Sequence, residues 1–413
     1  MTDEITSFEL YLSGSNSVTQ TNVVRETCAG HAPVYFMRER DKLLIATSVA
    51  ALISHTGVFE PNPSFEAPDF LARYFEQKSI AYRLAGRIRR KLKIRRPKAP
   101  DPFYATYETI DRRIHKLRAF ECVSTEGSKI EFNCDFTLAD ESAIVERSAL
   151  HITKLVNKIE ERFPDYRHII FTGGKDSQLI ILTPKLFPEN WAIFSAEPNY
   201  EDVLTWLEKN AITIKRIYRH DNQNEETPEE TELKIVASDL YSDPMHLRWL
   251  PKLKQIASDV DNKCIFWGGT ISSRSHFYAG QHVKDWGEDK MTFFRNHFER
   301  AAHWQGNSHQ VVKNFTGRPL ISPYYSEDIW RGLYRHIDPE IYLKRRVDLR
   351  DPLGEALAGR PVWWLPDNKG PEPYRYQKYI NARKIYSRYI RKALRNSRER
   401  RGVSADGVLQ GIG

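Results

Sequence analysis

The sequence has few cysteines and contains no long uninterrupted hydrophobic stretch. Its cysteines, Cys28, Cys122, Cys134 and Cys264, lie far apart, and none belongs to a CxxC pair. This scatter argues against a zinc site or a disulfide framework, so we expect reduced thiols. No apolar run approaches the roughly 20 residues that a transmembrane helix needs. The acidic start of the chain also lacks the hydrophobic core of a signal peptide. We therefore expect no membrane insertion and a cytoplasmic location.

Positive charge exceeds negative charge, and the excess is concentrated in two segments. The net charge is +8, and residues 82–98 and residues 383–401 each hold nine lysines and arginines. Glu399 is the one acidic residue in these two segments. Such patches bind nucleic acid or other polyanions, although a solvated linker and a solvated helix would have the same composition. Nucleic-acid binding through these segments therefore stays open.

The strongest local pattern of the chain follows the apolar run Ile169–Phe171, which indicates a buried strand. Directly after this run come a hydroxyl residue, two glycines and three polar residues: Thr172, Gly173, Gly174, Lys175, Asp176 and Ser177. The apolar stretch beyond them predicts a helix. A glycine turn between a strand and a helix start forms an anion pocket, because backbone amides can approach phosphate closely there. Asp176 is placed to bind, directly or through water, the Mg²⁺ that accompanies a polyphosphate.

This combination of strand, turn and helix resembles the pyrophosphate loop, SGGxDS, of the N-type ATP pyrophosphatases, with Thr172 in place of the serine. Those enzymes activate a carboxylate, amide or carbonyl oxygen as an adenylate and release pyrophosphate. The resemblance implies ATP and Mg²⁺ as cofactors, with the phosphates bound at Thr172–Ser177. The pattern is not a Walker A loop, because no Gly-Lys-Ser/Thr sequence ends a four-residue spacer. A glycine turn without any ligand is the structural alternative.

Hydrophobic patterning divides the chain into three parts: 1–140, 141–382 and 383–413. In the first part, short apolar runs predict β-strands at Phe8–Leu12, Val34–Met37, Leu43–Ala46 and Phe120–Val123. In the second part, helix-like and strand-like stretches alternate, which predicts an α/β fold with a parallel sheet. Its expected strands are Ile169–Phe171, Trp191–Phe194, Thr213–Tyr218 and Cys264–Trp267, and its expected helices are Ser142–Arg162, Ser177–Leu182, Tyr200–Lys209 and Met245–Val260. For the third part we expect a basic helix and a tail.

Beyond the loop, the chain resembles an asparagine synthetase-type protein with a shortened N-terminal half. Short segments similar to the family's patterns occur at Pro33–Phe36, Lys42–Leu52, Asp243-Pro244, Arg318–Pro323, Leu349-Arg350 and Asn368–Gly370. The resemblance implies an ATP pyrophosphatase (adenine nucleotide alpha hydrolase-like) domain, preceded by a shortened, β-rich, Ntn-hydrolase-like domain. It also implies that Ile170, Ala196 and Gly268 frame the adenosine. Lys369 falls where the family places a lysine that stabilises charge in the transition state.

Two departures from the family pattern change the expected chemistry. Glutaminases of this family use an N-terminal cysteine, whereas Thr2 stands near that position and the first cysteine is Cys28. We therefore expect no glutamine hydrolysis. In the second nucleotide loop, the family's glutamate and its metal-binding aspartate fall on Gly269 and Ser272. Because Mg²⁺ prefers carboxylate oxygens beside phosphates, we expect an acidic residue to supply the missing ligand, with Asp243 as the first candidate. A site with changed chemistry, or an inactive one, is the alternative.

Together these features predict an ATP-dependent, AMP-forming ligase. A substrate carboxylate would attack the α-phosphate, and an amine of a small molecule or peptide would then displace AMP to form an amide or macrolactam. Tyr278 is a candidate for orienting or deprotonating that amine. Two alternatives stay open: an ATP-dependent enzyme that modifies a nucleobase or tRNA, and a non-catalytic binding protein on a decayed synthetase fold. Homodimer formation also stays open.

Overall fold

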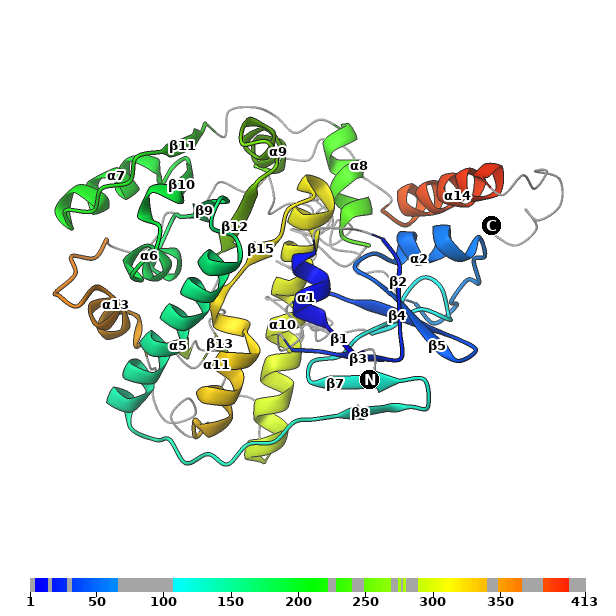
Figure 1. The fold of residues 1–413 in the computed structure, drawn as a ribbon, viewed down its shortest axis with the longest axis horizontal. Coiled ribbons are helices and arrows are strands. Elements are labelled where there is room, and N and C mark those ends of the chain that lie inside the picture. The colour runs from blue at the N-terminus through cyan, green and yellow to red at the C-terminus, as the bar shows by residue number, and fades with distance from the viewer. Residues whose placement is uncertain are drawn as a thin grey trace, which may run out of the picture.

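The computed structural model describes residues 4–13, 17–27, 32–65, 107–221, 228–239, 249–268, 274–275, 278–279, 289–339, 348–365 and 382–400. In Figure 1 the blue and cyan strands of the N-terminal part lie on one side of the long helix α10 (Lys290–Thr316). The green strands and helices of the following part lie mainly on its other side. The fold is mixed α and β, as the alternation of sequence patterns predicts.

A five-stranded, entirely parallel sheet organises the part of the chain that follows residue 141. Its spatial order is β11-β10-β9-β12-β15. The strands are β9 (Arg167–Phe171), β10 (Trp191–Ala196), β11 (Ile217–His220), β12 (Cys264–Gly268) and β15 (Leu320–Ile321). From β9 the chain adds β10 and β11 on one side, and then β12 and β15 on the other. The direction of strand addition therefore reverses between β9 and β12.

Helices cover both faces of this sheet, some of them packed on other helices. The described helices of this part are α5 (Glu141–Arg162), α6 (Lys175–Leu182), α7 (Tyr200–Lys209), α8 (Pro228–Ala237), α9 (Leu250–Asp259), α10, α11 (Glu327–Gly332) and α13 (Arg350–Ala358). Successive residues of a strand point to opposite faces. Accordingly, Ile170 belongs to a core with Leu179 of α6, and Ile169 belongs to another core with Leu253 of α9. Burial on both faces explains why the Ile169–Phe171 part of β9 is a continuous apolar run.

Two four-stranded sheets make up most of the N-terminal part. One has the order β1-β3-β7-β8 and the other the order β2-β5-β4-β6. Their strands are β1 (Glu4–Thr6), β2 (Thr19–Thr21), β3 (Val23–Arg25), β4 (Tyr35–Glu39), β5 (Lys42–Ala46), β6 (His115–Lys116), β7 (Glu121–Ser124) and β8 (Ser128–Ile130). The expected strands at 34–37, 43–46 and 120–123 are thus confirmed to within one or two residues. Helix α2 (Val49–Thr56) follows β5, and a short antiparallel pair, β13 (Arg274–Ser275) and β14 (Tyr278–Ala279), follows β12.

The strand expected at Phe8–Leu12 is wrong, because these residues lie in helix α1 (Ser7–Leu12). The Thr6 hydroxyl accepts a hydrogen bond from the Glu9 amide at 3.2 Å, which caps the first turn. A Thr-x-x-Glu sequence is a capping-box pattern. The helix is short, but the Tyr11 hydroxyl anchors it by donating to the carbonyl oxygen of Leu320 at 3.0 Å. The apolar residues of α1 are therefore buried by packing of the helix, and they need no pairing with a neighbouring strand.

The remaining expected elements agree with the structure to different degrees. Helices α5 and α7 are confirmed almost residue for residue, whereas β11 begins four residues later than the expected strand at 213–218. Ile212 and Ile214 lie in the preceding loop and pack, partly buried, against the core of the sheet. Their alternating pattern therefore reflects loop residues that cover the core. Of the helix expected at 245–260, the described residues form α9.

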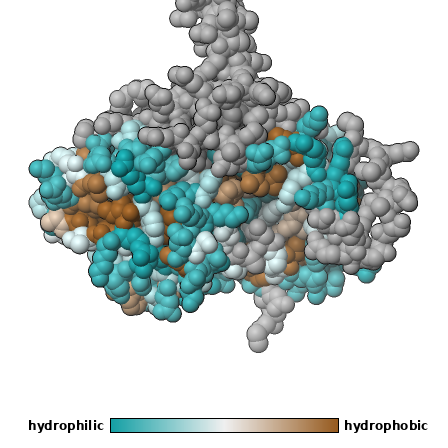
Figure 2. All heavy atoms as spheres, turned by 90° about the horizontal axis from the view of Figure 1, so that it is seen from above, coloured by the Kyte–Doolittle hydropathy of each residue, from teal (hydrophilic) through white to brown (hydrophobic). Residues whose placement is uncertain are grey.

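The basic helix expected near the C-terminal end is α14 (Ala382–Arg400), drawn in red beside α2 in Figure 1. Its apolar residues Ile385, Tyr386 and Ile390 are buried in one core with Leu52 and Ile53 of α2. Segments from opposite ends of the sequence thus share a core. None of the described helices has the length and hydrophobicity that a bilayer-spanning helix requires. On the face shown in Figure 2, hydrophobic residues form separate areas among hydrophilic ones.

Candidate functional site

The turn between β9 and α6 is closed by hydrogen bonds from its own residues. The Thr172 amide donates to the carbonyl oxygen of Phe194 on β10 at 2.9 Å. The Ser177 hydroxyl donates to the Gly174 carbonyl oxygen at 2.9 Å and lies 3.0 Å from the Thr172 hydroxyl. Gly174, in an extended conformation, precedes the first turn of α6 and has no side chain to cap it. The first amides of α6 are therefore available to an anion.

This turn lies at the reversal point of the parallel sheet. Phe171, the last residue of β9, pairs with Phe194 of β10 and with Gly268, the last residue of β12. The strands on both sides of the reversal point therefore end at one edge of the sheet. In open α/β sheets, ligands bind outside the carboxyl ends of the strands at such a point. The topology thus places a ligand position at the turn that the sequence pattern singles out.

Two carboxylates and one guanidinium group meet beside the turn. The Arg350 Nη1 atom donates to Oδ1 of Asp176 at 3.0 Å. The same guanidinium donates to both carboxylate oxygens of Asp348, at 2.8 and 2.7 Å. Although burial opposes it, the pKa of Arg350 is raised by its hydrogen bonds to these two carboxylates. Arg350 therefore stays charged and joins Asp176, at the start of α6, to the start of α13.

Lys175 also contacts α13. Its Nζ atom lies 2.8 Å from Oδ1 of Asp351 and 5.5 Å from the centre of the Trp364 ring. A role for Lys175 in phosphate binding, as the loop pattern suggests, would require its amine to leave Asp351. Two cations beside the turn, Lys175 and Arg350, are thus held by the carboxylates of Asp351 and Asp348, and Arg350 is also held by Asp176.

The carboxylates of Asp176 and Asp348 suit a metal that arrives with a phosphate ligand. Among the described residues, no group of three or more histidines, cysteines, aspartates or glutamates could hold a metal ion by itself. A Mg²⁺ ion bound to a polyphosphate, however, takes only one or two protein carboxylates. Asp176, whose side chain is 25% exposed, and Asp348 fit that smaller requirement. Arg350 is the cation that occupies this position between them.

The three residues expected around adenosine lie at or near the same edge of the sheet. Ile170 is fully buried, with its side chain in the core. Ala196 is half-buried at the end of β10. Gly268 is buried at the end of β12, and a Cβ atom there would lie 3.3 Å from Cδ1 of Leu320. A larger residue at position 268 would therefore press against β15, whereas glycine lets the two strands end close together.

Other predicted site residues fall on parts of the chain that are not described. Asp243 and Lys369 lie outside the described residues, as do Gly269 and Ser272 of the second loop. Tyr278 lies on β14, and its side chain is outside the described part of the structure. The described site therefore consists of the glycine turn, the start of α6 and the charged residues near the start of α13.

Sequence reasoning missed two contributors to this site. Tyr324 donates its hydroxyl to the Asp176 carbonyl oxygen at 2.6 Å, and burial raises its pKa well above the usual value. Nothing in the local sequence around Tyr324 indicates this contact. Asp348 was missed although the neighbouring Leu349-Arg350 pair resembles a family element. The acidic residues that flank Arg350 were the available signal for a charged cluster.

Comparison with known proteins does not assign the protein to a family. No family model matches the sequence, and no curated protein is significantly similar to it.

Proposed function

We propose that the protein is an ATP-dependent, AMP-forming ligase that activates a carboxylate as an adenylate and joins it to an amine. The observation that carries this proposal is the glycine turn Thr172–Gly174 at the reversal point of a parallel sheet. The order of the strands and the SGGxDS-like loop together support an ATP pyrophosphatase-type domain. The β-rich N-terminal part would be the shortened, Ntn-hydrolase-like half of an asparagine synthetase-like protein.

In this proposal the phosphates of ATP lie against the first amides of α6. Asp176 would hold the Mg²⁺ that ATP brings, which would shield the negative charge of the departing pyrophosphate. Arg350 would exchange part of its contact with Asp176 for the phosphates, because guanidinium groups bind phosphate and carboxylate in the same forked geometry. Ala196 and Gly268 would frame the adenosine. Lys369 and Tyr278 keep the roles that the resemblance implies, at the transition state and at the amine.

A binding measurement tests the nucleotide site without knowledge of the acyl substrate. Replacing Asp176 by alanine removes the proposed metal ligand, so Mg·ATP affinity measured by calorimetry should fall more than about tenfold, or about 1.4 kcal/mol. Asp165→Ala is the matched control, because Asp165 is exposed in the turn before β9, at the other end of that strand. Equal affinities for wild type and Asp176→Ala would contradict the proposed site.

Modification of a nucleobase in RNA is a second candidate function, and the exposed side of α14 favours it. The buried side of this helix is apolar, whereas its exposed side is basic and carries Lys384, Arg388, Arg391, Lys392 and Arg395. A basic helix face is the electrostatic footprint of polyanion binding. If the substrate is RNA, replacing Arg391, Lys392 and Arg395 by glutamine should weaken binding of labelled tRNA and reduce its salt dependence. If the variant binds tRNA as the wild type does, RNA modification is ruled out and the ligase acting on a small molecule or peptide stays as the proposal.

A further inference from the structure

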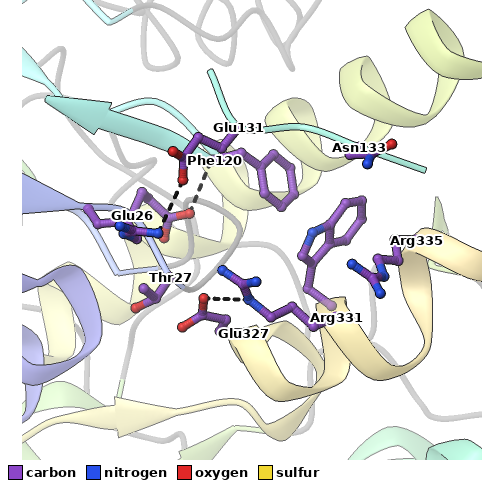
Figure 3. A pocket seen from close by; sticks show the side chains of 10 residues that line it. Glu26, Thr27, Phe120, Glu131, Asn133, Glu327, Arg331 and Arg335 are labelled. Carbon is purple, nitrogen blue, oxygen red and sulfur yellow. Dashed lines mark hydrogen bonds and ion pairs between the residues drawn. The ribbon is translucent and has the colours of Figure 1, made fainter. Parts of the chain in front are cut away.

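A cavity of about 310 Å³ lies among the end of β3, the β7–β8 region and α11 with the residues that follow it. These elements are different from those that build the glycine turn. Figure 3 shows Glu26 and Glu131 on one side of the cavity and Asn133 and Arg335 on the other. The volume is at the lower end of the range for small-molecule sites, which is roughly 300–1,000 Å³.

Most charged groups around the cavity are already bonded to one another. Arg25 lies 3.2 Å from Glu131, and Arg331 lies 2.7 Å from Glu327, one helical turn away. Glu26 is buried and accepts hydrogen bonds from a hydroxyl and from a backbone amide, each at 3.2 Å. The acidic groups of the wall are therefore satisfied by the protein itself, and they do not make the cavity a cation site.

Arg335 differs from the other two arginines of the wall. Its Nε atom donates to Nε2 of His336 at 3.0 Å, and Nδ1 of the same ring lies 2.7 Å from Oδ1 of Asp135. These linked hydrogen bonds fix the plane of the Arg335 guanidinium. Within the described part of the chain, no carboxylate forms an ion pair with Arg335, and the side-chain amide of Asn133 forms no hydrogen bond. A positive charge and an amide are thus left facing the same space.

The floor of the cavity is aromatic and rigid. Trp330 is 7% exposed, and its ring centre lies 4.3 Å from that of Phe120 and 4.8 Å from that of Phe298. Phe120 has a φ of +62°, a conformation that is strained for a bulky side chain. Proteins keep such strained residues where the surroundings over-determine them, often at ligand sites. The strained backbone of Phe120, a residue that lines the cavity, is therefore a separate indication that the cavity binds a ligand.

We propose that this cavity binds a small organic carboxylate with an aromatic or other apolar body. The carboxylate would pair with the terminal nitrogens of Arg335, whose fork matches two carboxylate oxygens, and would accept a hydrogen bond from the Asn133 amide. The apolar body would lie on Trp330 and Phe120. The site is independent of the proposed nucleotide site, since it shares no residue with the glycine turn or with the charged cluster beside it.

Calorimetry with defined probes tests this site on the full chain without ATP. The probes are hippurate and L-phenylalanine, with phenethylamine and inorganic phosphate for comparison. Hippurate, L-phenylalanine or both should bind, and binding should be at least about tenfold tighter than that of phenethylamine or phosphate, because it needs both a carboxylate and an apolar body. Asn133→Ala, at an exposed position, should weaken it severalfold without a change in melting temperature. Arg335→Gln should weaken it at least about tenfold.

Arg147→Gln is the matched control, because Arg147 is exposed on α5 and is absent from the cavity wall. It should bind the carboxylate probes as the wild type does. Three results would each overturn the proposal: neither carboxylate binds, phenethylamine or phosphate binds as well as the carboxylates, or every folded variant of the pair Asn133→Ala and Arg335→Gln keeps wild-type affinity. Because Asn133→Ala removes only an exposed amide, the test survives even if Arg335→Gln fails to fold.

Discussion

The contact between Asp176 and Arg350 joins positions 174 residues apart and decides how the proposed nucleotide site is charged. With Arg350 in place, the turn has beside it a cation that is shared by two carboxylates. Both side chains are largely buried, at 25% and 16% exposed. A phosphate group can accept the same guanidinium hydrogen bonds as a carboxylate, so the arginine could exchange one anion for the other and stay paired. In the structure the arginine lies between the carboxylates. Under the proposed function the site would have a second state, with Mg²⁺ bound by the carboxylates and the arginine turned to phosphate.

This view predicts a specific response to Mg²⁺ when the arginine is removed. In Arg350→Gln, Asp176 and Asp348 lose their shared cation and should bind free Mg²⁺ more tightly. Thermal unfolding should then show a Mg²⁺-dependent stabilisation that exceeds that of the wild type by roughly 1 kcal/mol when Mg²⁺ is several times its dissociation constant. The double variant Asp176→Ala/Arg350→Gln should lose this gain. Equal Mg²⁺ effects on wild type and Arg350→Gln would refute the two-state description.

At the scale of the element, α13 supports α6 through close packing. Gly354 of α13 packs against the Trp364 ring, and a Cβ atom there would overlap this ring and lie 3.2 Å from Cδ1 of Leu182 in α6. The same indole ring lies over Lys175. The glycine is therefore needed for close approach, and the packing that it permits extends to the first residue of the helix that follows the glycine turn.

Gly354→Ala should destabilise the protein although alanine favours helix. The helix propensity gain is at most about 1 kcal/mol, whereas overpacking typically costs about 1–3 kcal/mol. Chemical denaturation should show the net loss. Gly127→Ala is the control, since a Cβ atom at Gly127 would meet nothing within 4 Å and should change stability by less than about 0.5 kcal/mol. A variant at position 354 as stable as wild type would contradict the packing.

A buried carboxylate links α14 to the rest of the fold. Asp239 follows α8 and is 3% exposed. It accepts hydrogen bonds from the Tyr386 hydroxyl of α14 at 2.6 Å and from the Gln310 amide of α10 at 2.5 Å. The backbone amide of Val49, the first residue of α2, lies 3.3 Å from it. Burial raises the pKa of Asp239 to about 7 despite these bonds.

This pKa predicts how stability depends on pH. Between about pH 4 and pH 7 the unfolded state ionises Asp239 while the folded state keeps it protonated, so its contribution to stability falls as pH rises. Asp239→Asn removes that dependence. The melting temperature of this variant minus that of the wild type should therefore increase from pH 4 to pH 7. Above pH 7 this difference should change less. Burial lowers the pKa of the Lys116 amine to about 7. In the unfolded protein this amine stays charged to about pH 10, so Lys116 affects stability mainly between pH 7 and pH 10.

The comparison should be made as a difference between the variant and the wild type at each pH. His168 and His309 are buried, and burial lowers their pKa values to about 4 and about 3, so their effect on stability has the opposite sign between pH 4 and pH 6.5. Taking the difference cancels these histidines. A difference that stays constant from pH 4 to pH 7 would show that Asp239 is ionised in the folded protein.

Local sequence signals predicted the elements whose structure is decided locally. The apolar run before Thr172 and the glycines after it predicted β9 and the turn, and amphipathic spacing predicted α5. Phe8–Leu12 was mistaken for a strand because a short apolar run has no period of its own, and the Thr6 cap was overlooked. Helix α10 was also missed, although Asp289 caps its start and Gly317, with a φ of +72°, ends it.

The arrangement of charges in the site could not be predicted in the same way. Asp348 and Arg350 reach Asp176 because α13 packs on α6, which is a long-range contact without a local signature. The resemblance to an asparagine synthetase-type family singled out the Leu349-Arg350 pair but gave it no role. Two-residue strands such as β15 escape recognition for a related reason, since only their pairing with β12 defines them.

At the scale of the whole molecule, the parts suggested by the sequence share their cores. Leu12 and Phe120 of the N-terminal part belong to the same core as Ile170 of the parallel sheet. Helix α14 shares a core with α2, so the basic C-terminal segment is packed against the N-terminal part over its described residues. We therefore expect cooperative coupling between the N-terminal part and the proposed nucleotide site. It would be seen as stabilisation of both by added ATP.

The proposed ligase cleaves ATP between the α- and β-phosphates, so it should exchange labelled pyrophosphate into ATP. Wild-type protein would be incubated with ATP, Mg²⁺, labelled pyrophosphate and a panel of carboxylic and amino acids, beside Asp176→Ala and the control Asp165→Ala. We expect label in ATP for wild type and Asp165→Ala with at least one acid, and none for Asp176→Ala. Mg·ATP binding without exchange for any acid, or ADP as the nucleotide product, would rule out an AMP-forming ligase.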